Sequence, residues 1–549
     1  MITESRNIQA YVLSLGLQHR PDSMTSIRDI LEIGDIMLRQ YIDQGIVEVY
    51  QDDDTYFKVR ILDYDKYLES NDEFVINLAP RWVDKDKGIY FISMPDGSRK
   101  AKPLISFDYT NPSNKVTDKS CIETIIKLNQ IRWKVWEHIL AYDRVPKKPI
   151  TDEMGREQYE AISRWMIATV TELSDAEFCF GHYYDKRGRI YNDGFLVNYQ
   201  GDEWSKAAIH PAIKAERLTK RGLRAFQCDI ANNLGLDKAT YDERVNAVLA
   251  LDDLKSVKPK KNILFDKAIW FYNQIDKNNG ETDYVCQIDA TASCLQIQAI
   301  IANDSEVAKH TNLTDVSMCY DIYGEACKKV LSVTKSKLSV RDIRDIVKKA
   351  VMTAGYNSKK QISVAQQELA KLGVYINMAQ LESIVYTGEK VRGVLQAINN
   401  LFSSVQTDMV EYTMPDGFVV QLPNITKASI RVVNPEYYYK YTMRYDERGY
   451  DFELNWRSLA PNIIHSIDSY ICRELIRRCK FTVYSIHDCF ACHPNNVDTL
   501  RLTYIQLLKE IQSINILDYI GKQINPDFSY IPEGQPFEIA ESADSYCLC

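Results

Sequence analysis

Two short apolar segments, far apart in the chain, each end in an aspartate. Val285-Cys-Gln-Ile-Asp289 leads into a helix start within Thr291-Ala-Ser293, and Tyr484-Ser-Ile-His487-Asp488 leads into a turn. Both segments have the composition of a buried strand. Two aspartates delivered in this way can meet on neighbouring strands, and Mg²⁺ prefers a few carboxylates together with waters and substrate phosphates. Taken singly, a capping Asp289 or a hydrogen-bonded His487–Asp488 core pair also explains these segments.

A predicted helix places Arg344, Lys348, Met352 and Tyr356 on one stripe, since 3.6 residues make a helical turn. Two cations one turn apart suit a triphosphate, and an aromatic ring further along the stripe suits a sugar and base. The alternative is a solvated basic face. The aromatic residue in the same register favours the nucleotide site.

The segment Asp185-Lys-Arg187-Gly188-Arg189 is typical of a tight turn. Two arginines that flank a glycine suit contacts to a phosphate backbone. From these residues alone, an ordinary solvated basic turn is an equally good interpretation.

Read together, these segments resemble the single-subunit DNA-directed RNA polymerases of bacteriophages and mitochondria. The matching motifs are Asp-x-x-Gly-Arg at 185–189, Asp289 with Ser293 and Gln296, Asp321-Ile-Tyr-Gly324, Arg-x₃-Lys-x₇-Tyr at 344–356, Ala460-Pro-Asn-x-x-His465-Ser-x-Asp468, and Ile486-His-Asp-x-Phe490. They occur in the family's order, and weaker likeness begins near residue 30. Six modest motifs in one order make coincidence improbable.

The resemblance implies an α/β fold, mainly helical with a palm β-sheet, in the right-hand arrangement of palm, fingers and thumb. It also implies a metal site. Asp289, Asp488 and the backbone carbonyl of Ala290 would bind two Mg²⁺ ions, and His487 would support Asp488.

The same resemblance implies residues that hold the nucleotide and the nucleic acid. Those expected at the incoming nucleotide are Arg344, Lys348, Lys349, Tyr356 and His465, with Lys348 and Tyr356 also counted as catalytic. Those expected at the nucleic acid are Arg187, Arg189 and Lys206. Positioning and charge stabilisation are the main work of such a site.

Departures from the family pattern bear on the product. The family usually has Gly where this chain has Ala290 and Asn357. Related DNA polymerases place a bulky Glu, which blocks a ribose 2′-OH, where Cys294 stands, and another Glu where Cys489 stands. Both cysteines favour ribonucleotides. The alternatives left open are a DNA polymerase or primase-like enzyme of the same fold, and a non-catalytic nucleic-acid-binding subunit.

A β-hairpin is expected between Pro415-Asp-Gly417 and Asn455, with a turn at Asp446-Glu-Arg-Gly449 and with Phe452 on the return strand. Its outgoing strand alternates Lys440 and Arg444 with tyrosines. A basic, aromatic ribbon suits the DNA major groove, which the hairpin at this place enters in the family. An ordinary exposed hairpin is the alternative.

Five parts are predicted along the chain. They are a short N-terminal domain (1–117), thumb-like helices (118–175), a first palm part (176–305), fingers (306–465, with the hairpin at 418–455) and a second palm part (466–549). Local patterns also predict a helix pair within 23–45, one long helix from Asp118 to Tyr142 and a helix over about 155–172.

Charge and targeting signals set the expected partners and location. The net charge of −8 argues against a protein that coats nucleic acid, yet cations gather at 206–224, so a channel can be positive inside an acidic surface. With no signal-peptide pattern and no long apolar run, we expect a cytoplasmic monomer in an infected bacterial host, away from membranes. The expected partners are a DNA template, the RNA product and ribonucleoside triphosphates. The short upstream region suggests a need for single-stranded template, or for a single-stranded-DNA-binding or promoter-loading helper protein.

Overall fold

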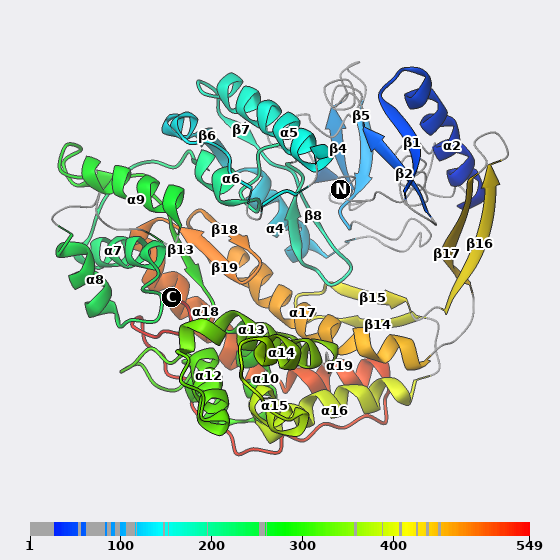
Figure 1. Ribbon diagram of the computed structural model, residues 1–549. Coiled ribbons are helices and arrows are strands. Elements are labelled where there is room, and N and C mark those ends of the chain that lie inside the picture. Colours follow the sequence, from blue (N-terminus) through cyan, green and yellow to red (C-terminus); the bar gives the residue numbers. More distant parts are fainter. Residues whose placement is uncertain are drawn as a thin grey trace.

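In the computed structural model of the 549-residue chain, the described residues are 27–52, 56–61, 83–84, 89–93, 99–105, 116, 118–146, 149–151, 153–194, 196–251, 259, 261–355, 359–386, 388–405, 409–423, 426–434, 439–447 and 452–549. Helices and short β-sheets alternate along the chain, as Figure 1 shows. The predicted mixed class of helix and strand is confirmed.

A three-stranded antiparallel sheet lies in the middle of the molecule (Figure 1). Its strands are β13 (Cys286–Asp289), β19 (Cys489–Cys492) and β18 (Val483–Ile486), in the order β13-β19-β18. Both strands predicted to end near an aspartate are therefore present. They are neighbours through β19, which pairs Cys489 with Asp289 on one side and with Ile486 on the other.

Helices pack around this sheet. Helix α10 (Ser293–Ala302) follows β13, and every residue from Leu295 to Ala302 is buried, including Gln296 and Gln298, whose side-chain amides donate to backbone carbonyls. Below the sheet in Figure 1 lie α12 (Ile322–Thr334), α13 (Val340–Ala354), α14 (Lys359–Lys371), α15 (Met378–Val385) and α16 (Glu389–Ser403). The long α17 (Phe452–Arg478) leads into β18, and α18 (Val497–Ser513) and α19 (Ile516–Ile524) follow the sheet.

The single helix predicted from Asp118 to Tyr142 is wrong. Helix α4 (Lys119–Asn129) ends early, and β6 (Arg132–Val135) and the 3-10 helix η2 (Glu137–Ala141) follow. Trp133 and Val135 are buried between more exposed cations, which is the period-two pattern of a strand. Strand β6 pairs with β10 (Ile209–Pro211) and β7 (Phe178–Cys179). Long-range pairing thus overrides a helical spacing that was coincidental.

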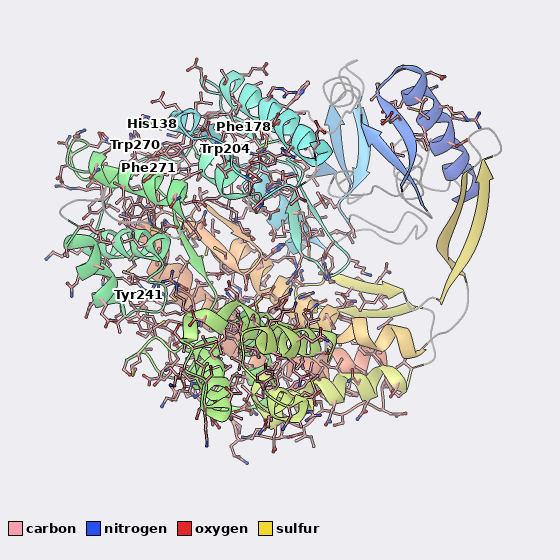
Figure 2. All side chains as sticks on the ribbon, in the orientation of Figure 1. His138, Phe178, Trp204, Tyr241, Trp270 and Phe271 are labelled. Carbon is pink, nitrogen blue, oxygen red and sulfur yellow. The ribbon has the colours of Figure 1, made fainter. Side chains whose placement is uncertain are left out.

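An aromatic cluster joins this second sheet to its helices. Trp136 and His138 meet Trp270 of α9 (Asn262–Gln274), and Trp270 meets Phe271. Trp204 of α6 (Glu203–Ala208) donates from its indole N–H to the Tyr142 carbonyl at 3.0 Å. Figure 2 shows His138, Trp204, Trp270 and Phe271 gathered in one corner of the molecule.

The N-terminal part also differs from the prediction. One helix, α2 (Ile27–Asp43), continues through Gly34 in place of the predicted helix pair, and β1 (Val47–Asp52) pairs with β2 (Tyr56–Ile61). A small sheet of β3 (Val83–Asp84), β4 (Ile89–Ser93) and β5 (Arg99–Pro103) follows. The alternating residues Ile46-Val-Glu-Val-Tyr50 predict a strand, and β1 confirms it.

The predicted hairpin turn at Asp446–Gly449 is also wrong. Two hairpins occur, β14 (Met409–Thr413) with β15 (Val419–Pro423), and β16 (Thr426–Asn434) with β17 (Tyr439–Glu447). Phe452 begins α17 and does not lie on a return strand. The β-branched run before β17 supplies its partner strand, β16.

The remaining elements complete the frame. They are α5 (Glu153–Glu172), β8 (His182–Tyr184), β9 (Ile190–Asn192), β11 (Glu216–Arg217), α7 (Lys220–Leu234), α8 (Tyr241–Leu249), β12 (Glu281–Thr282), α11 (Ser305–His310) and η4 (Pro494–Asn496). Helix α5 matches the prediction for residues 155–172. No helix in the described part of the chain combines the length and the apolar character needed to cross a membrane.

Candidate functional site

Asp289 and Asp488 lie at the same edge of the central sheet. Asp289 is the last residue of β13 and pairs with Cys489, and Asp488 directly precedes Cys489 in the two-residue turn between β18 and β19. His487, the first residue of that turn, has φ = 58°, a conformation that few non-glycine residues adopt. The turn therefore brings together the two aspartates that the sequence predicted as partners.

Hydrogen bonds from Ala290 and Ser293, where β13 leads into α10, hold Asp488 in place. The Ser293 hydroxyl donates to Asp488 Oδ2 at 2.8 Å, and the Ala290 amide donates to the Asp488 carbonyl at 3.0 Å. On the other side of β13, Asp289 exchanges two backbone hydrogen bonds with Cys549. The Asp289 backbone is thus held between two neighbouring segments.

A third carboxylate, Asp468 of α17, belongs to the same group. Desolvation by surrounding protein, followed by the charge of Asp488, raises the pKa of Asp289 to about 7 and that of Asp468 to about 7. Asp289 is exposed to solvent, so the surrounding protein packs beside its side chain and does not enclose it. We call Asp289, Asp468 and Asp488 the carboxylate cluster. It carries negative charge that a cation would stabilise.

Lysines surround Asp289. The positive charges of Lys238 and Lys261 lower the pKa of Asp289, but burial and the charge of Asp488 raise it more. Lys206, predicted to contact nucleic acid, is close enough for Asp289 to raise its pKa, although burial lowers that pKa overall. No motif in the sequence singles out Lys238, and Lys261 lies at the end of a stretch rich in lysine, residues 251–261.

The arginine turn at 185–189 connects the two hairpin strands β8 and β9 and lies beside α17. Arg187 donates to Asp185 Oδ2 at 2.6 Å and to His465 Nδ1 at 3.0 Å, while Arg189 pairs with Asp468 at 3.4 Å. Burial and then the charges of Arg189 and Arg187 lower the pKa of His465 to about 3. Since Nδ1 accepts a hydrogen bond, the neutral ring carries its proton on Nε2.

His487 lies close to the arginine turn, and its ring meets the Tyr191 ring edge to face at 5.5 Å. Burial and the charge of Arg189 lower its pKa. Four predicted residues, Arg187, Arg189, His465 and His487, therefore gather near the carboxylate cluster.

A buried ion pair holds this turn in place. Gly188 has φ = 82°, and an added Cβ would collide with the guanidinium of Arg473. Arg473 of α17 donates from Nη1 to the Gly188 carbonyl at 2.9 Å and from Nη2 to Asp416 Oδ1 at 2.9 Å. The arginine turn, α17 and the β14–β15 connection are thereby tied together, which positions His465 and Asp468.

Helix α13 carries the predicted nucleotide-binding cations. Ser339 and Asp342 form a capping box at its start, and its apolar face, including Ile343 and Val347, is buried. Lys348 lies over the Tyr323 ring, with 5.4 Å from Nζ to the ring centre. We call α13, with Arg344, Lys348 and Lys349, the cation helix.

Tyr323 links the cation helix to the carboxylate cluster. Burial raises its pKa, and the charges of Cys294, Asp488, Asp289 and Asp321 raise it further. Lys349 is exposed on the same helix. Tyr356, the last member of the predicted stripe, lies outside the described residues.

The hairpin cations lie elsewhere. Lys440 pairs with Val433 and Arg444 with Ser429 in the β16–β17 ribbon, which lies at the edge of the molecule in Figure 1, away from the central sheet. The structure therefore leaves these two residues on a ribbon separate from the carboxylate cluster and the cation helix.

Comparison with known proteins agrees with this geometry. The family model for DNA-dependent RNA polymerase matches residues 216–533, more than half of the chain. The chain belongs to the DNA-dependent RNA polymerase family. The match covers the carboxylate cluster and the cation helix, and it ends before the Cys549 segment that pairs with Asp289.

Several relatives of this polymerase-family chain carry related names. A probable DNA-directed RNA polymerase of Gelasinospora sp. (strain G114) is 24% identical, over 80% of this chain and 60% of the relative. The mouse mitochondrial DNA-directed RNA polymerase is 22% identical, over 72% of this chain and 36% of the relative. The DNA-directed RNA polymerase of Pseudomonas phage phiKMV is 22% identical, over 66% of this chain and 54% of the relative. The chain spans about half the length of the curated relatives it matches.

The donor set of this polymerase-family site fits a magnesium ion that shares its coordination with a substrate. Among the described residues, no group of three or more His, Cys, Asp or Glu side chains is arranged to hold a metal by itself. Mg²⁺ commonly uses only one or two carboxylates, with waters and substrate phosphates in the other positions. Asp289 and Asp488, with their mutual repulsion, match that requirement.

Proposed function

We propose that this chain synthesises RNA from ribonucleoside triphosphates on a DNA template. The observation that carries the proposal is the meeting of Asp289 and Asp488 at one edge of the central sheet, with Tyr323 linking them to the cation helix. The family and its relatives support the same chemistry. A right-hand arrangement, with the central sheet as palm and α12–α16 in the fingers, belongs to this proposal.

Asp289, Asp488 and the Ala290 carbonyl would hold two Mg²⁺ ions. When bound, these ions stabilise the attacking and leaving oxygens of an in-line phosphoryl displacement. The Ser293 hydroxyl orients the Asp488 carboxylate, and His487 sets the turn that presents it. Repulsion within the carboxylate cluster favours the metal-bound state.

Other residues would position the substrate and product. Arg344, Lys348 and Lys349 would bind the triphosphate, and Tyr356 would contact the sugar and base. Burial and then the charges of Arg189 and Arg187 keep His465 neutral, and its Nε2–H would donate to an acceptor at the growing end of the product. The two arginines and Lys206 would contact the nucleic acid.

The residue facing the start of the Tyr356 segment favours ribose. The Cys294 thiol lies 3.0 Å from the position of a Cβ built on Gly355, the last described residue before Tyr356. A thiol there leaves room that a glutamate would fill, so a 2′-OH can be accommodated. A DNA polymerase of the same fold is the second candidate, and substrate choice separates the two.

One assay tests the proposal. A primed single-stranded DNA template with Mg²⁺ is incubated with ribonucleotides or with deoxyribonucleotides, and primer extension is measured. We expect extension with ribonucleotides and its loss in Asp488→Asn, with Asp527→Asn, an exposed residue on the surface, as the control. Preferential use of deoxyribonucleotides would support the second candidate, and activity retained by Asp488→Asn would exclude the proposed site.

The finer setting stays a prediction. It comprises transcription of phage genes in the cytoplasm of an infected bacterium, action as a monomer, dependence on single-stranded template or a helper, and promoter contact by Lys440 and Arg444. The relatives include both mitochondrial and phage polymerases. Comparing initiation on single-stranded and linear duplex promoter DNA tests the dependence, because efficient initiation on duplex by the chain alone contradicts it.

A further inference from the structure

Asp321 binds the fork of Arg344 with both carboxylate oxygens. Arg344 Nη1 donates to Asp321 Oδ2 at 2.5 Å, and Arg344 Nη2 donates to Asp321 Oδ1 at 3.0 Å. The two side chains are only 26% and 23% exposed, so water screens this pair less than a surface pair. Asp321 lies on the loop that leads into α12, and Arg344 lies on the cation helix.

The start of α12 holds the Asp321 carboxylate from the other side. An added Cβ at Gly324 would come within 2.6 Å of Asp321 Oδ2, so only glycine leaves room for this carboxylate. Burial opposes ionisation of Asp321, but hydrogen bonds and charge from Arg344 and a hydrogen bond from the Gly324 amide leave its pKa below the usual value. The carboxylate is therefore charged and fixed in place.

The same segment also contacts the second cation. Tyr323, two residues after Asp321, presents its ring to Lys348. One short segment, Asp321-Ile-Tyr-Gly324, thus contacts both cations that are spaced one turn apart on α13. Nothing in the local sequence of α13 dictates this arrangement.

We propose that Asp321 is a positioning residue that presets Arg344 to receive the nucleotide triphosphate. An arginine fork has five N–H donors, and the carboxylate engages two of its nitrogens at one edge, which leaves donors for a phosphate. A free arginine side chain loses rotamer entropy when it is fixed, and Asp321 fixes it before the substrate arrives. This inference rests on the proposed function, since it assumes that Arg344 binds the triphosphate.

The test measures steady-state primer extension by the full chain with Asp321→Asn. We expect KM for the ribonucleoside triphosphate to rise about tenfold, with kcat and the dissociation constant of primed template within about twofold of wild type. Glu325→Gln is the matched control, because it removes the exposed Glu325–Lys328 pair from the same helix. It should leave KM unchanged. Asp321→Glu, which keeps the charge, should recover part of the loss.

A double-mutant cycle shows whether Asp321 acts through Arg344. In an Arg344→Ala background, Asp321→Asn should change KM no further. Gly324→Ala, which pushes the carboxylate away without removing it, should raise KM like Asp321→Asn. If Asp321→Asn proves unfolded by thermal melting, Gly324→Ala and Arg344→Lys carry the same test, because lysine lacks the fork.

The outcomes separate this inference from the proposed function. An unchanged or lower KM in Asp321→Asn, while Arg344→Ala still raises KM, overturns the positioning role alone. An unchanged KM in Arg344→Ala contradicts the triphosphate role of Arg344 itself. A fall in kcat or in template binding, without the KM change, would make Asp321 a merely structural residue and overturn the inference.

Discussion

The carboxylate cluster and the cation helix are built in opposite ways. The cluster joins three segments, and one of its hydrogen bonds spans 195 residues of sequence. The cations come from a single helix whose capping box and apolar face are local. Charges in the cluster repel one another, whereas Arg344 and Lys348 already have partners in Asp321 and Tyr323. In the proposed function, the proposed metal site would therefore lie next to a phosphate site whose arginine already has a fixed partner.

The largest expected effect is in the cluster. Asp488→Asn should lower kcat at least about 10³-fold, because several kcal/mol of charge stabilisation through the metal are lost. Primer extension under saturating nucleotide measures this. The fold should persist, since asparagine can still accept from Ser293. If Asp488→Asn keeps activity within tenfold of wild type, the carboxylate cluster does not hold the metal as proposed, and its contrast with the cation helix fails.

The second effect concerns the buried Arg473–Asp416 ion pair, which holds the arginine turn beside the cluster. Arg473→Leu leaves Asp416 charged and unpaired in the interior, where both side chains are 1% exposed, and should lower the free energy of unfolding by about 3–5 kcal/mol. Chemical denaturation measures the change. Lys509→Met, which breaks the exposed Lys509–Glu541 pair, is the control and should cost less than about 1 kcal/mol. Equal effects would show that the arginine turn is not held by this pair.

A smaller effect is expected on the cation helix. Lys348→Ala should raise KM for the nucleotide about 10–100-fold, since a hydrogen bond to a charged group contributes about 1.5–3 kcal/mol. Thermal melting should change little, because Lys348 is exposed. Lys349→Ala, one residue on and also exposed, is the comparison within the helix. A larger effect of Lys349→Ala would reassign the main phosphate contact.

The smallest effect concerns pH. Between 3.8 and about 7, the folded metal-free protein keeps protons on Asp289 and Asp468 that the unfolded chain releases. Stability should therefore fall as pH rises through this window and level off above it, by on the order of 1 kcal/mol for Asp468. Denaturation midpoints with a chelator at several pH values measure the slope. Asp468→Asn should flatten it, and a slope of opposite sign would contradict the repulsion.

Local patterns predicted the parts of the site that depend on near neighbours. The strand ends at Asp289 and Asp488 and the helix at Arg344 follow from composition and period. The sequence placed Asp468 in a motif but did not predict that it joins the carboxylate cluster, because that depends on how α17 packs beside β18. The strand β6 and the partner of β17 were missed for the same reason, since pairing with distant segments decided them.

By itself, the sequence determined which residues could carry the chemistry: two aspartates that follow apolar segments, two cations one helical turn apart, and a turn in which two arginines flank a glycine. Only the tertiary structure decided that Asp468 joins the carboxylates, that Arg473 holds the arginine turn, and that Asp321 forms an ion pair with Arg344. The physical reason is that charge effects depend on distance in space and on burial. Sequence spacing fixes distance only within one helix or one strand.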